Sequence, residues 1–299
     1  MDYSSVTFIG GGIRRVQLDG VRFFDADKIF DCGQAFRFSP VDGTRHEKEW
    51  SGVARGIFVS VGQDGCRVVI YNSDERDFRE IWEKYFSLDL DYGEIEKDIL
   101  SRHPSERLRE AALAGRGIRI LRQDPWEALC SFIISQNNNI PRIRSLVSAL
   151  SRAAGERVDT RGMEDHGAAE EEYAFPSAGA VASLGEDALK EMRMGFRAGY
   201  IDAASKSVAG GSLRFGDVEK LPTADASRLL QTLRGVGPKV AACVLLFGFF
   251  RTDAFPVDVW IRRVLEKYFP EGLDPSELGQ YAGIAQQFLF RYERETQGV

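Results

Sequence analysis

The sequence predicts an α+β protein in which a β-rich antiparallel N-terminal part precedes a larger part made mainly of α-helices. Two patterns lead to this prediction. Residues Ile57–Tyr71 alternate between apolar and polar side chains on both sides of Asp64-Gly65, which is typical of a β-hairpin. After Gly117, apolar residues recur instead with helical spacing over almost the whole remaining chain.

Further elements complete the first part. The stretches "AFRFSP" (residues 35–40) and "EWSGVARG" (49–56) are expected to be short strands. The pattern then becomes helical over "RDFREIWEKYF" (76–86) and "PSERLREAALAG" (104–115). We therefore expect residues 1–117 to form one domain, an antiparallel sheet that carries a few helices.

The second part begins with a well-marked helix, "QDPWEALCSFIISQ". Asp124 can cap this helix, Pro125 suits its first position, and Glu127 completes an arrangement like a capping box. Other helices are expected at residues 143–155, 187–195, 199–211, 225–233 and 259–269. The glutamate-rich stretch Arg157–Glu172 has few large apolar residues and is predicted to be a surface loop or insertion.

The helical part is expected to divide into two domains. Residues 118–228 form a helical domain that carries the asparagine triplet Asn137–Asn139. Residues 229–299 form a region with most of a helix-hairpin-helix stretch, "DASRLLQTLRGVGPKVAACVLLFGF" (225–249), and with C-terminal helices.

The composition is that of an ordinary soluble globular protein, with 43% hydrophobic and 28% charged residues. No apolar run is long enough to cross a bilayer, and the N-terminus lacks the features of a secretory signal. The four cysteines are scattered without a Cys-x-x-Cys pair, so neither a zinc site nor an iron–sulfur cluster is expected. These observations favour a cytoplasmic protein with no membrane partner.

The charge balance gives a mixed indication about nucleic acids. A formal net charge of -6 argues by itself against nucleic acid as a partner. Arginines nevertheless gather locally along the sequence, and a basic face can exist on a protein whose total charge is negative. For any single arginine pair, a solvated helix face is the simpler interpretation.

The turn between the two helices of this stretch has the features of a phosphate-binding hairpin. Gly235 and Gly237 allow unusual backbone angles and a close approach of another backbone. Pro238 can start the second helix without losing a hydrogen bond. The free N–H groups of Gly235, Val236 and Gly237 then lie at a helix N-terminus, which favours contact with DNA backbone phosphate. A plain αα-hairpin with a glycine turn is the structural alternative.

A lysine and an aspartate occupy unexpected places beside this turn. The positive end of the helix dipole disfavours the ammonium of Lys239, so a partly buried amine there is a candidate nucleophile. The alternative for Lys239 is a point charge that binds phosphate. Asp258 follows Phe-Pro-Val at the start of the next helix, where it can serve as an N-cap. A capping carboxylate is fixed in place, so Asp258 could also face Lys239 and stabilise positive charge on a sugar.

Several stretches together resemble a known family. The hairpin, its lysine and Pro-Val-Asp resemble the signature of the helix-hairpin-helix DNA glycosylase superfamily, in which a lysine here marks bifunctional members that also cut the strand. The chain is similar to the 8-oxoguanine DNA glycosylase family in "CGQAFRF" (32–38), "ILRQDPWEALCSFIISQNNNIPRI" (120–143), "GIAQQFLF" (283–290) and, more weakly, "MGFRAGYI" (194–201). These matches cover nearly the whole chain.

The resemblance implies a bifunctional DNA N-glycosylase and AP lyase. Lys239 resembles the family's nucleophile, which attacks the sugar C1′, displaces the damaged base and forms a Schiff base before β-elimination nicks the strand. Asp258 resembles the carboxylate that stabilises the oxocarbenium-like transition state. Pre-placed charge of this kind is usually a large catalytic contribution.

The resemblance also implies a pocket for a base flipped out of the duplex. Cys243, one helical turn after Lys239, and Phe290 resemble the two walls that sandwich the base, although a small core residue is the alternative for Cys243. Gln286 resembles the residue that bonds the Watson–Crick edge. The carbonyl of Gly33 resembles the acceptor for N7–H, which 8-oxoguanine has and guanine lacks, so an unpaired buried acceptor would reject guanine.

A third set of residues resembles those that hold the opposite strand. Asn137, Arg142 and Arg197 resemble the residues that fill the gap and hold the orphaned cytosine, and Phe196 resembles the aromatic wedge that buckles the stack. Two positions depart from the family pattern. Phe196 stands where many relatives carry tyrosine, and Trp260 stands where animal members carry a phosphate-contacting histidine. These departures favour a bacterial-type member.

The expected partner is therefore duplex DNA that contains 8-oxoguanine, bound by a monomer in the cytoplasm of a bacterium near its nucleoid. No cofactor and no metal ligands are expected, although the hairpin carbonyls could hold a structural cation. Three alternatives stay open: a glycosylase of this superfamily for another base, a non-catalytic DNA-binding module, and a protein that binds no DNA. The absent cysteine cluster and the presence of Lys239 with Asp258 disfavour the first two.

Overall fold

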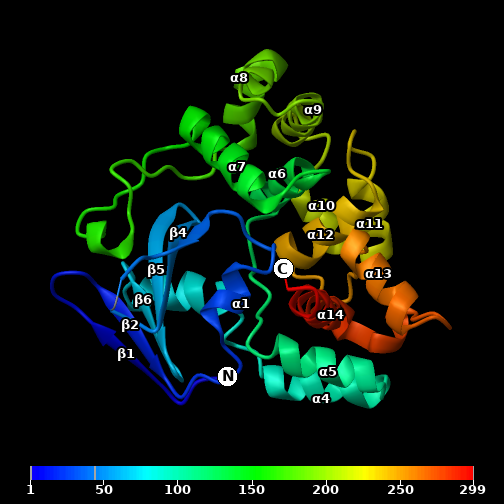
Figure 1. The fold of residues 1–299 in the computed structure, drawn as a ribbon. Helices are drawn as coiled ribbons and strands as arrows, with labels where there is room; N and C mark the ends of the chain where they lie inside the picture. The colour runs from blue at the N-terminus through cyan, green and yellow to red at the C-terminus, as the bar shows by residue number, and fades with distance from the viewer. Residues whose placement is uncertain (1, 44, 299) are drawn as a thin grey trace.

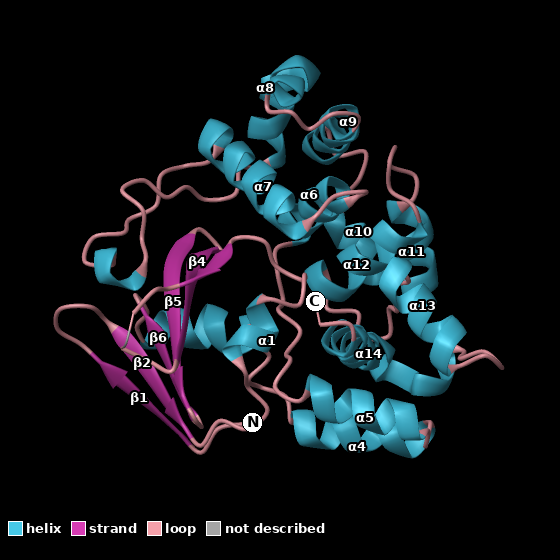
Figure 2. Ribbon diagram, in the orientation of Figure 1, coloured by secondary structure: helices cyan, strands magenta, loops and turns pink. Residues whose placement is uncertain are grey.

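The computed structural model describes residues 2–43 and 45–298, so Met1 and Val299, the ends of the predicted first and third domains, lie outside it. The predicted α+β class is confirmed. A six-stranded antiparallel sheet from the N-terminal part lies on one side of the molecule, and helices make up the other side (Figures 1 and 2).

The sheet contains all the predicted strands and two that the sequence analysis missed. Its order is β1-β2-β6-β5-β4-β3, with antiparallel neighbours throughout. The strands are β1 (Ser5–Ile9), β2 (Arg15–Asp19), β3 (Phe38–Pro40), β4 (Lys48–Ala54), β5 (Ile57–Asp64) and β6 (Arg67–Tyr71). The predicted hairpin is β5–β6, in which Asp64 pairs with Arg67 and Gly65 takes a positive φ of 53° in the turn.

Most of the helices follow the sheet in sequence, whereas α1 lies between β2 and β3. They are α1 (Ala26–Phe30), α2 (Glu75–Asp77), α3 (Glu83–Tyr85), α4 (Tyr92–Arg102), α5 (Glu106–Gly115), α6 (Pro125–Ser135), α7 (Ile140–Ala154), α8 (Ala178–Glu191), α9 (Arg197–Ala209), α10 (Phe215–Lys220), α11 (Thr223–Leu230), α12 (Pro238–Gly248), α13 (Val259–Tyr268) and α14 (Ala282–Thr296). A π-helical turn, Phe78–Trp82, joins α2 to α3. The predicted cap of α6 is present, because Asp124 accepts hydrogen bonds from the N–H groups of Trp126 and Glu127.

Two main hydrophobic cores divide the chain differently from the predicted domain boundaries. One core lies between the inner face of the sheet and the helical segments around Phe30 and Trp82. The other joins α6 to α14, and it also includes α4 and α5, which pack beside α14 (Figure 1). Gly115 permits this packing, because a Cβ there would lie 2.3 Å from the Phe288 ring. The boundaries at 117 and 228 stay predictions.

The stretch Arg157–Glu172 is irregular and mostly exposed, as predicted, but it also covers the outer face of the sheet. Met163 is buried there among Val53, Phe58 and Val69. His166 is buried as well, and its Nδ1 lies 2.7 Å from Glu49 Oε1 on β4. The segment is therefore anchored to the sheet by one apolar and one polar contact.

A buried arginine ties the N-terminal strand region to the connection between the two cores. The Arg119 side chain is fully buried, and its Nη2 donates to Asp2 Oδ2 at 2.6 Å. Its Nη1 donates to the carbonyl of Ser87 at 2.7 Å and its Nε to that of Phe23 at 2.9 Å. Every contact joins segments far apart in sequence, so Arg119 acts as a cross-link. No helix in the described part of the chain is both long and apolar enough to span a membrane.

Replacing Arg119 by methionine is expected to lower the free energy of unfolding by about 3–5 kcal/mol, because the buried Asp2 carboxylate loses its cation. Denaturant unfolding measures this loss. Arg76→Met is the matched control, since the Arg76 side chain is 80% exposed and its ion pair with Glu80 should add little. Equal stability of the two variants would contradict the cross-link.

Candidate active site

The hairpin between α11 and α12 has the predicted geometry. Gly235 takes a positive φ of 84°, and a Cβ there would lie 2.3 Å from the Tyr200 ring, so only glycine fits. The carbonyl of Gly235 accepts a hydrogen bond from Gln136 Nε2 at 2.9 Å. Gly237 is the N-cap residue of α12 and provides no side-chain cap. The amides of Gly235 and Gly237 are therefore available to an anion at a helix N-terminus, whereas the predicted third amide, that of Val236, donates to the carbonyl of Leu233 at 3.1 Å.

Lys239 and Asp258 come together at one cleft. Lys239 lies in the first turn of α12, and its Nζ is 5.4 Å from the centroid of the Phe132 ring. Asp258 is the N-cap of α13, where its Oδ1 accepts from the N–H of Ile261 at 2.8 Å. Both residues line a cleft of about 760 Å³. Both also line a smaller pocket of about 50 Å³ at the side of this cleft.

The smaller pocket gathers every residue that was predicted to hold the base. Its walls include Gly33, Cys243, Gln286 and Phe290. Gln286 is buried, and its Oε1 accepts a hydrogen bond from Gln287 Nε2 at 2.8 Å. A volume of about 50 Å³ holds little more than a water molecule, so a purine would enter only with displacement of a wall.

A buried glutamine holds the wall that carries Gly33. The side chain of Gln34 is fully buried, and its Oε1 accepts from the N–H of Leu121 at 2.9 Å. The backbone carbonyl of Gln34 accepts from Gln123 Nε2 at 2.6 Å, while the N–H of Gln123 donates to the carbonyl of Phe247 at 2.9 Å. Because Phe247 lies in α12, this network links the Gly33 wall to the helix of Lys239.

The Cys243 thiol faces both charged residues. Burial raises the pKa of Cys243 to about 11, an effect that the Lys239 ammonium opposes and the Asp258 carboxylate reinforces. The thiol is therefore neutral near pH 7 and contributes a compact apolar surface to the pocket.

The residues that were predicted to contact the opposite strand lie at the mouth of the cleft, and they differ in how exposed they are. Asn137 and Phe196 line the cleft and are exposed, and Asn137 has a positive φ of 49°. Arg197 is buried instead, with its Nε donating to the carbonyl of Gln136 at 2.8 Å and its Nη2 to that of Asn137 at 2.8 Å. Its guanidinium also lies 4.5 Å from the Phe196 ring centroid. Arg197 thus supports the two exposed residues.

Arg142 is exposed at the start of α7, and its Nη2 donates to the carbonyl of Arg193 at 2.9 Å. Burial, and after it the positive charge of Arg142, lowers the pKa of Arg197. A direct contact of either arginine with an opposite base stays a prediction.

Two functional positions were missed from the sequence. Phe132 of α6 forms a wall of both the cleft and the smaller pocket, and its ring stacks on Phe247 at 5.3 Å. Gln136 bonds the hairpin carbonyl and is itself bonded by Arg197. Gln136 directly precedes the asparagine triplet, and this position in the sequence was the sign of its functional role. No sequence feature singled out Phe132, because its helix is apolar on most sides.

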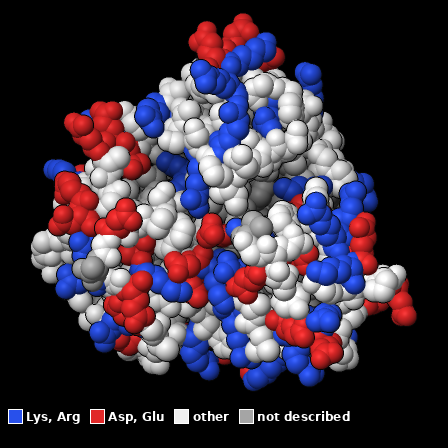
Figure 3. All heavy atoms as spheres, viewed as in Figure 1, with Lys and Arg blue, Asp and Glu red and all other residues white. Residues whose placement is uncertain are grey.

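Charge is distributed unevenly over the surface. Basic side chains gather over α7–α9 and over the region of α11–α13, on two sides of the central hollow, whereas acidic side chains gather over the sheet and the segment that covers it (Figure 3). The net charge of -6 therefore coexists with a basic surface around the cleft. Among residues 2–43 and 45–298, no three His, Cys, Asp or Glu side chains are arranged to hold a metal ion.

Comparison with known proteins identifies the family. Residues 18–129 match the family described as "8-oxoguanine DNA glycosylase, N-terminal domain". The chain is 30% identical over 293 residues to N-glycosylase/DNA lyase OGG1 of Arabidopsis thaliana, covering 90% of this chain and 77% of that protein. The chain belongs to the 8-oxoguanine DNA glycosylase family. The resemblance inferred from the motifs is thus confirmed.

Solved structures extend this result to the whole fold. The 8-oxoguanine glycosylase/lyase of Clostridium acetobutylicum, in complex with double-stranded DNA containing cytosine opposite 8-oxoguanine, is 35% identical. The two structures superpose with a TM-score of 0.88 over 99% of this chain and 100% of that chain. A 3-methyladenine DNA-glycosylase from Archaeoglobus fulgidus shares the fold alone, with a TM-score of 0.62 and 20% identity over 82% of this chain and 87% of that one.

The raised pKa of Cys243 leads to a labelling prediction. Near neutral pH, iodoacetamide should modify the exposed Cys66 and leave Cys243 unmodified, because Cys243 is buried and protonated. Labelling of Cys243 should rise only as the pH approaches about 11 or as the protein unfolds. Peptide mass spectrometry reads both sites in one sample, and equal labelling at neutral pH would contradict the buried pocket wall.

Proposed function

We propose that this chain excises 8-oxoguanine from duplex DNA and then cuts the strand at the resulting site. The observation that carries the proposal is the meeting of Lys239 and Asp258 at a pocket whose other walls include Cys243, Gln286 and Phe290. The Arabidopsis relative is named as an N-glycosylase/DNA lyase, and the Clostridium relative as an 8-oxoguanine glycosylase/lyase. One amine and one carboxylate are sufficient for both base excision and strand cutting.

The proposed chemistry begins at the sugar of the flipped nucleotide. The neutral amine of Lys239 forms a bond to C1′, and the bond from C1′ to the base breaks with its electron pair going to the base. A proton from water or from the amine then neutralises the departing base. The Asp258 carboxylate stabilises the positive charge that builds up on the sugar in the transition state, since its position is fixed by the helix cap.

Strand cutting follows from the same covalent bond. Opening of the sugar ring turns the Lys239 adduct into a protonated Schiff base, which makes the C2′ hydrogen acidic. Transfer of that proton to water and departure of the 3′ phosphate complete β-elimination, and hydrolysis of the Schiff base by water then releases the lysine. Besides water, these steps use only groups of this chain and of the DNA, and they need no cofactor. A cation on the hairpin carbonyls would act on DNA binding alone.

Recognition of the base is proposed to rest on the walls of the small pocket. The Gly33 carbonyl accepts the N7–H of 8-oxoguanine and leaves guanine without a partner, while Gln286 bonds the Watson–Crick edge. Cys243 and Phe290 enclose the two ring faces. Displacement of a pocket wall, which the small volume requires, would accompany entry of the base.

DNA binding is proposed to use three surfaces around the cleft. The amides of Gly235 and Gly237 hold a backbone phosphate, and Phe196 is the wedge that enters the stack. Asn137 and Arg142 face the orphaned base, and Arg197 holds their loop in place. We expect a monomer bound to duplex DNA, in the cytoplasm of a bacterial cell.

Borohydride trapping tests the proposed function. The wild type should form a covalent complex with duplex that contains 8-oxoguanine, whereas Lys239→Gln should bind the same duplex and trap none. Denaturing gel electrophoresis separates the trapped complex. Either no product with the wild type or undiminished product with the variant would overturn the mechanism.

The role of Asp258 can be separated from its role as a helix cap. In Asp258→Asn the amide oxygen still accepts from the helix, so stability should change little. The excision rate should nevertheless fall by about 10²- to 10³-fold, because the carboxylate charge is gone. Single-turnover kinetics measures the rate. Asp124→Asn, the same change at the cap of α6, should leave the rate intact, and equal losses in both variants would refute the electrostatic role.

A further inference from the structure

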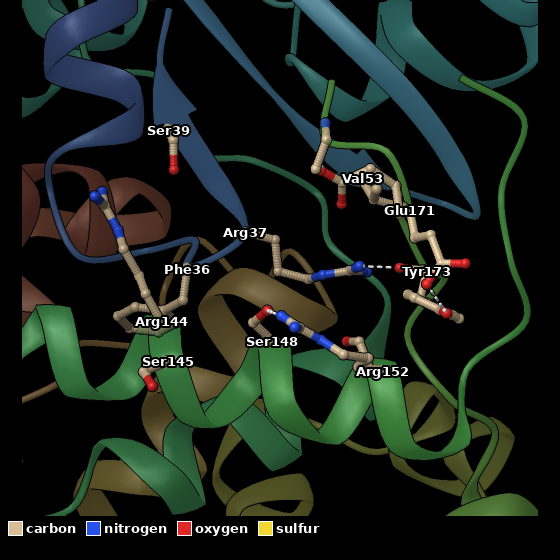
Figure 4. A pocket seen from close by; sticks show the side chains of 13 residues that line it. Phe36, Arg37, Ser39, Val53, Arg144, Ser145, Ser148, Arg152, Glu171 and Tyr173 are labelled. Atoms are coloured by element: carbon tan, nitrogen blue, oxygen red, sulfur yellow. Dashed lines mark hydrogen bonds between the residues drawn. The ribbon is translucent and has the colours of Figure 1, made fainter. Parts of the chain in front are cut away.

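A second cavity lies on the other side of Phe36 from the cleft. It has a volume of about 360 Å³ and lies between β3, α7 and the segment that ends near Tyr173 (Figure 4). We call it the α7 pocket. The polar side chains that matter in it are Arg37, Arg144, Ser148, Ser151 and Arg152. Phe36 lines both this pocket and the cleft, so the two sites are neighbours.

Two arginines project into the α7 pocket. In Figure 4 the Arg37 guanidinium points to the carbonyl of Tyr173, to which its Nη2 donates, and the Arg152 guanidinium points to Ser148. The Arg37 side chain is only 9% exposed, and Glu127 Oε2, its ion-pair partner, lies 4.0 Å away. Arg152 Nη2 donates to Ser148 Oγ at 3.2 Å, and Arg152 has no ion pair in the described part of the chain. Arg152 therefore keeps a positive charge without a carboxylate partner, which favours an anion beside it.

Several buried polar atoms of the same pocket also lack a hydrogen-bond partner among the described residues. They are Arg37 Nη1, Arg144 Nε and Ser151 Oγ. A buried donor without an acceptor is costly, and most proteins avoid it. An anion with several acceptor oxygens could satisfy more than one of these donors at once.

The acidic groups near the pocket do not neutralise these arginines. Glu171 forms an ion pair with Arg157 at 3.3 Å and accepts from Tyr173 Oη at 2.9 Å. Glu172 Oε1 accepts from the N–H of Ala169 at 3.4 Å. Burial raises the pKa of Glu127, an effect that the Arg37 guanidinium opposes, and the Glu127 Oε2 atom lies 4.0 Å from Arg37 Nη1. Asp31, which is partly exposed, lies 4.0 Å from Arg144.

We propose that the α7 pocket binds a backbone phosphodiester of the DNA that occupies the neighbouring cleft. Forked guanidinium donors and serine hydroxyls suit phosphate oxygens. The distance from the cleft to the α7 pocket also suits a DNA strand. From Ile140, which lines the cleft, to Ser148, which lines the pocket, α7 rises about 12 Å, and one DNA strand carries about three to four phosphates over that length. The inference rests on the proposed function, because it needs DNA in the cleft.

A scan with neutral phosphates tests the pocket. Duplexes in which one phosphate at a time is replaced by methylphosphonate are bound to the wild type, to Arg152→Gln and to Arg161→Gln. Arg161 is the matched control, since it lies on the segment that covers the sheet and is 90% exposed. At one or two positions the wild type should lose about threefold to tenfold in affinity, and Arg152→Gln should show no further loss there.

The control variant and a second substitution at Arg152 test whether the loss of affinity depends on the charge of Arg152. Arg161→Gln should keep the wild-type pattern, and Arg152→Lys should keep part of the penalty, because the charge remains. On unmodified duplex, Arg152→Gln should also lower the slope of log affinity against log salt by about one. A flat scan for the wild type, or the same pattern in Arg152→Gln, would overturn the proposal.

A further arm separates DNA from free phosphate. Inorganic phosphate is titrated into the DNA-free protein while the melting temperature is followed. Stabilisation of the wild type but not of Arg152→Gln, together with a flat methylphosphonate scan, would assign the pocket to a free phosphate group and refute the DNA source. Borohydride trapping on the wild type keeps the two proposals apart, because excision together with a scan in which no loss depends on Arg152 removes only the α7 pocket inference.

Discussion

The buried polar connection through Gln34 and Gln123 is the constraint on which the candidate site depends. Gln34 bonds the carbonyl of Arg119 at 2.8 Å and the N–H of Leu121 at 2.9 Å, so it fastens the Gly33 wall to the segment between the two cores. Gln123 bonds both Gln34 and the carbonyl of Phe247. Buried amides are costly unless all their groups are paired, so this network permits few alternative positions of the two walls.

The residues around the reacting groups are also held in place by their neighbours. Asp258 is held by the helix that it caps, Gly235 by the Tyr200 ring, and Gln136 by a bond to the hairpin turn. A site of this kind is rigid before DNA arrives, which is what electrostatic stabilisation of a transition state requires. The small pocket volume is the exception, because a base needs more room than the described structure provides. Because the Gly33 wall and α12 are held together, the motion that a base requires is expected at the wall formed by Gln286 and Phe290.

Local patterns were predicted well, and contacts between distant segments were not. The β5–β6 hairpin, the cap of α6 and the turn before Lys239 each follow from a few adjacent residues. Strands β1 and β2 were missed because they are only five residues long and β1 lies at the sheet edge, partly exposed. The packing of α4 and α5 on the C-terminal helix, and the burial of Met163 and His166 on the sheet, depend on long-range contacts that no local period reveals.

The site residues show the same limit at the level of single side chains. Motif spacing predicted which residues would gather, but it could not predict that Arg197 turns inward while Phe196 stays exposed, since both directions suit the start of a helix. The net charge likewise does not predict where charged side chains gather on the surface. A chain with net charge -6 can still bind a polyanion, because its acidic groups lie over the sheet and its arginines lie around the cleft and in the α7 pocket. The proposed phosphate site in the α7 pocket rests on local charge, above all on Arg152, which has no ion pair in the described part of the chain, and not on the total charge.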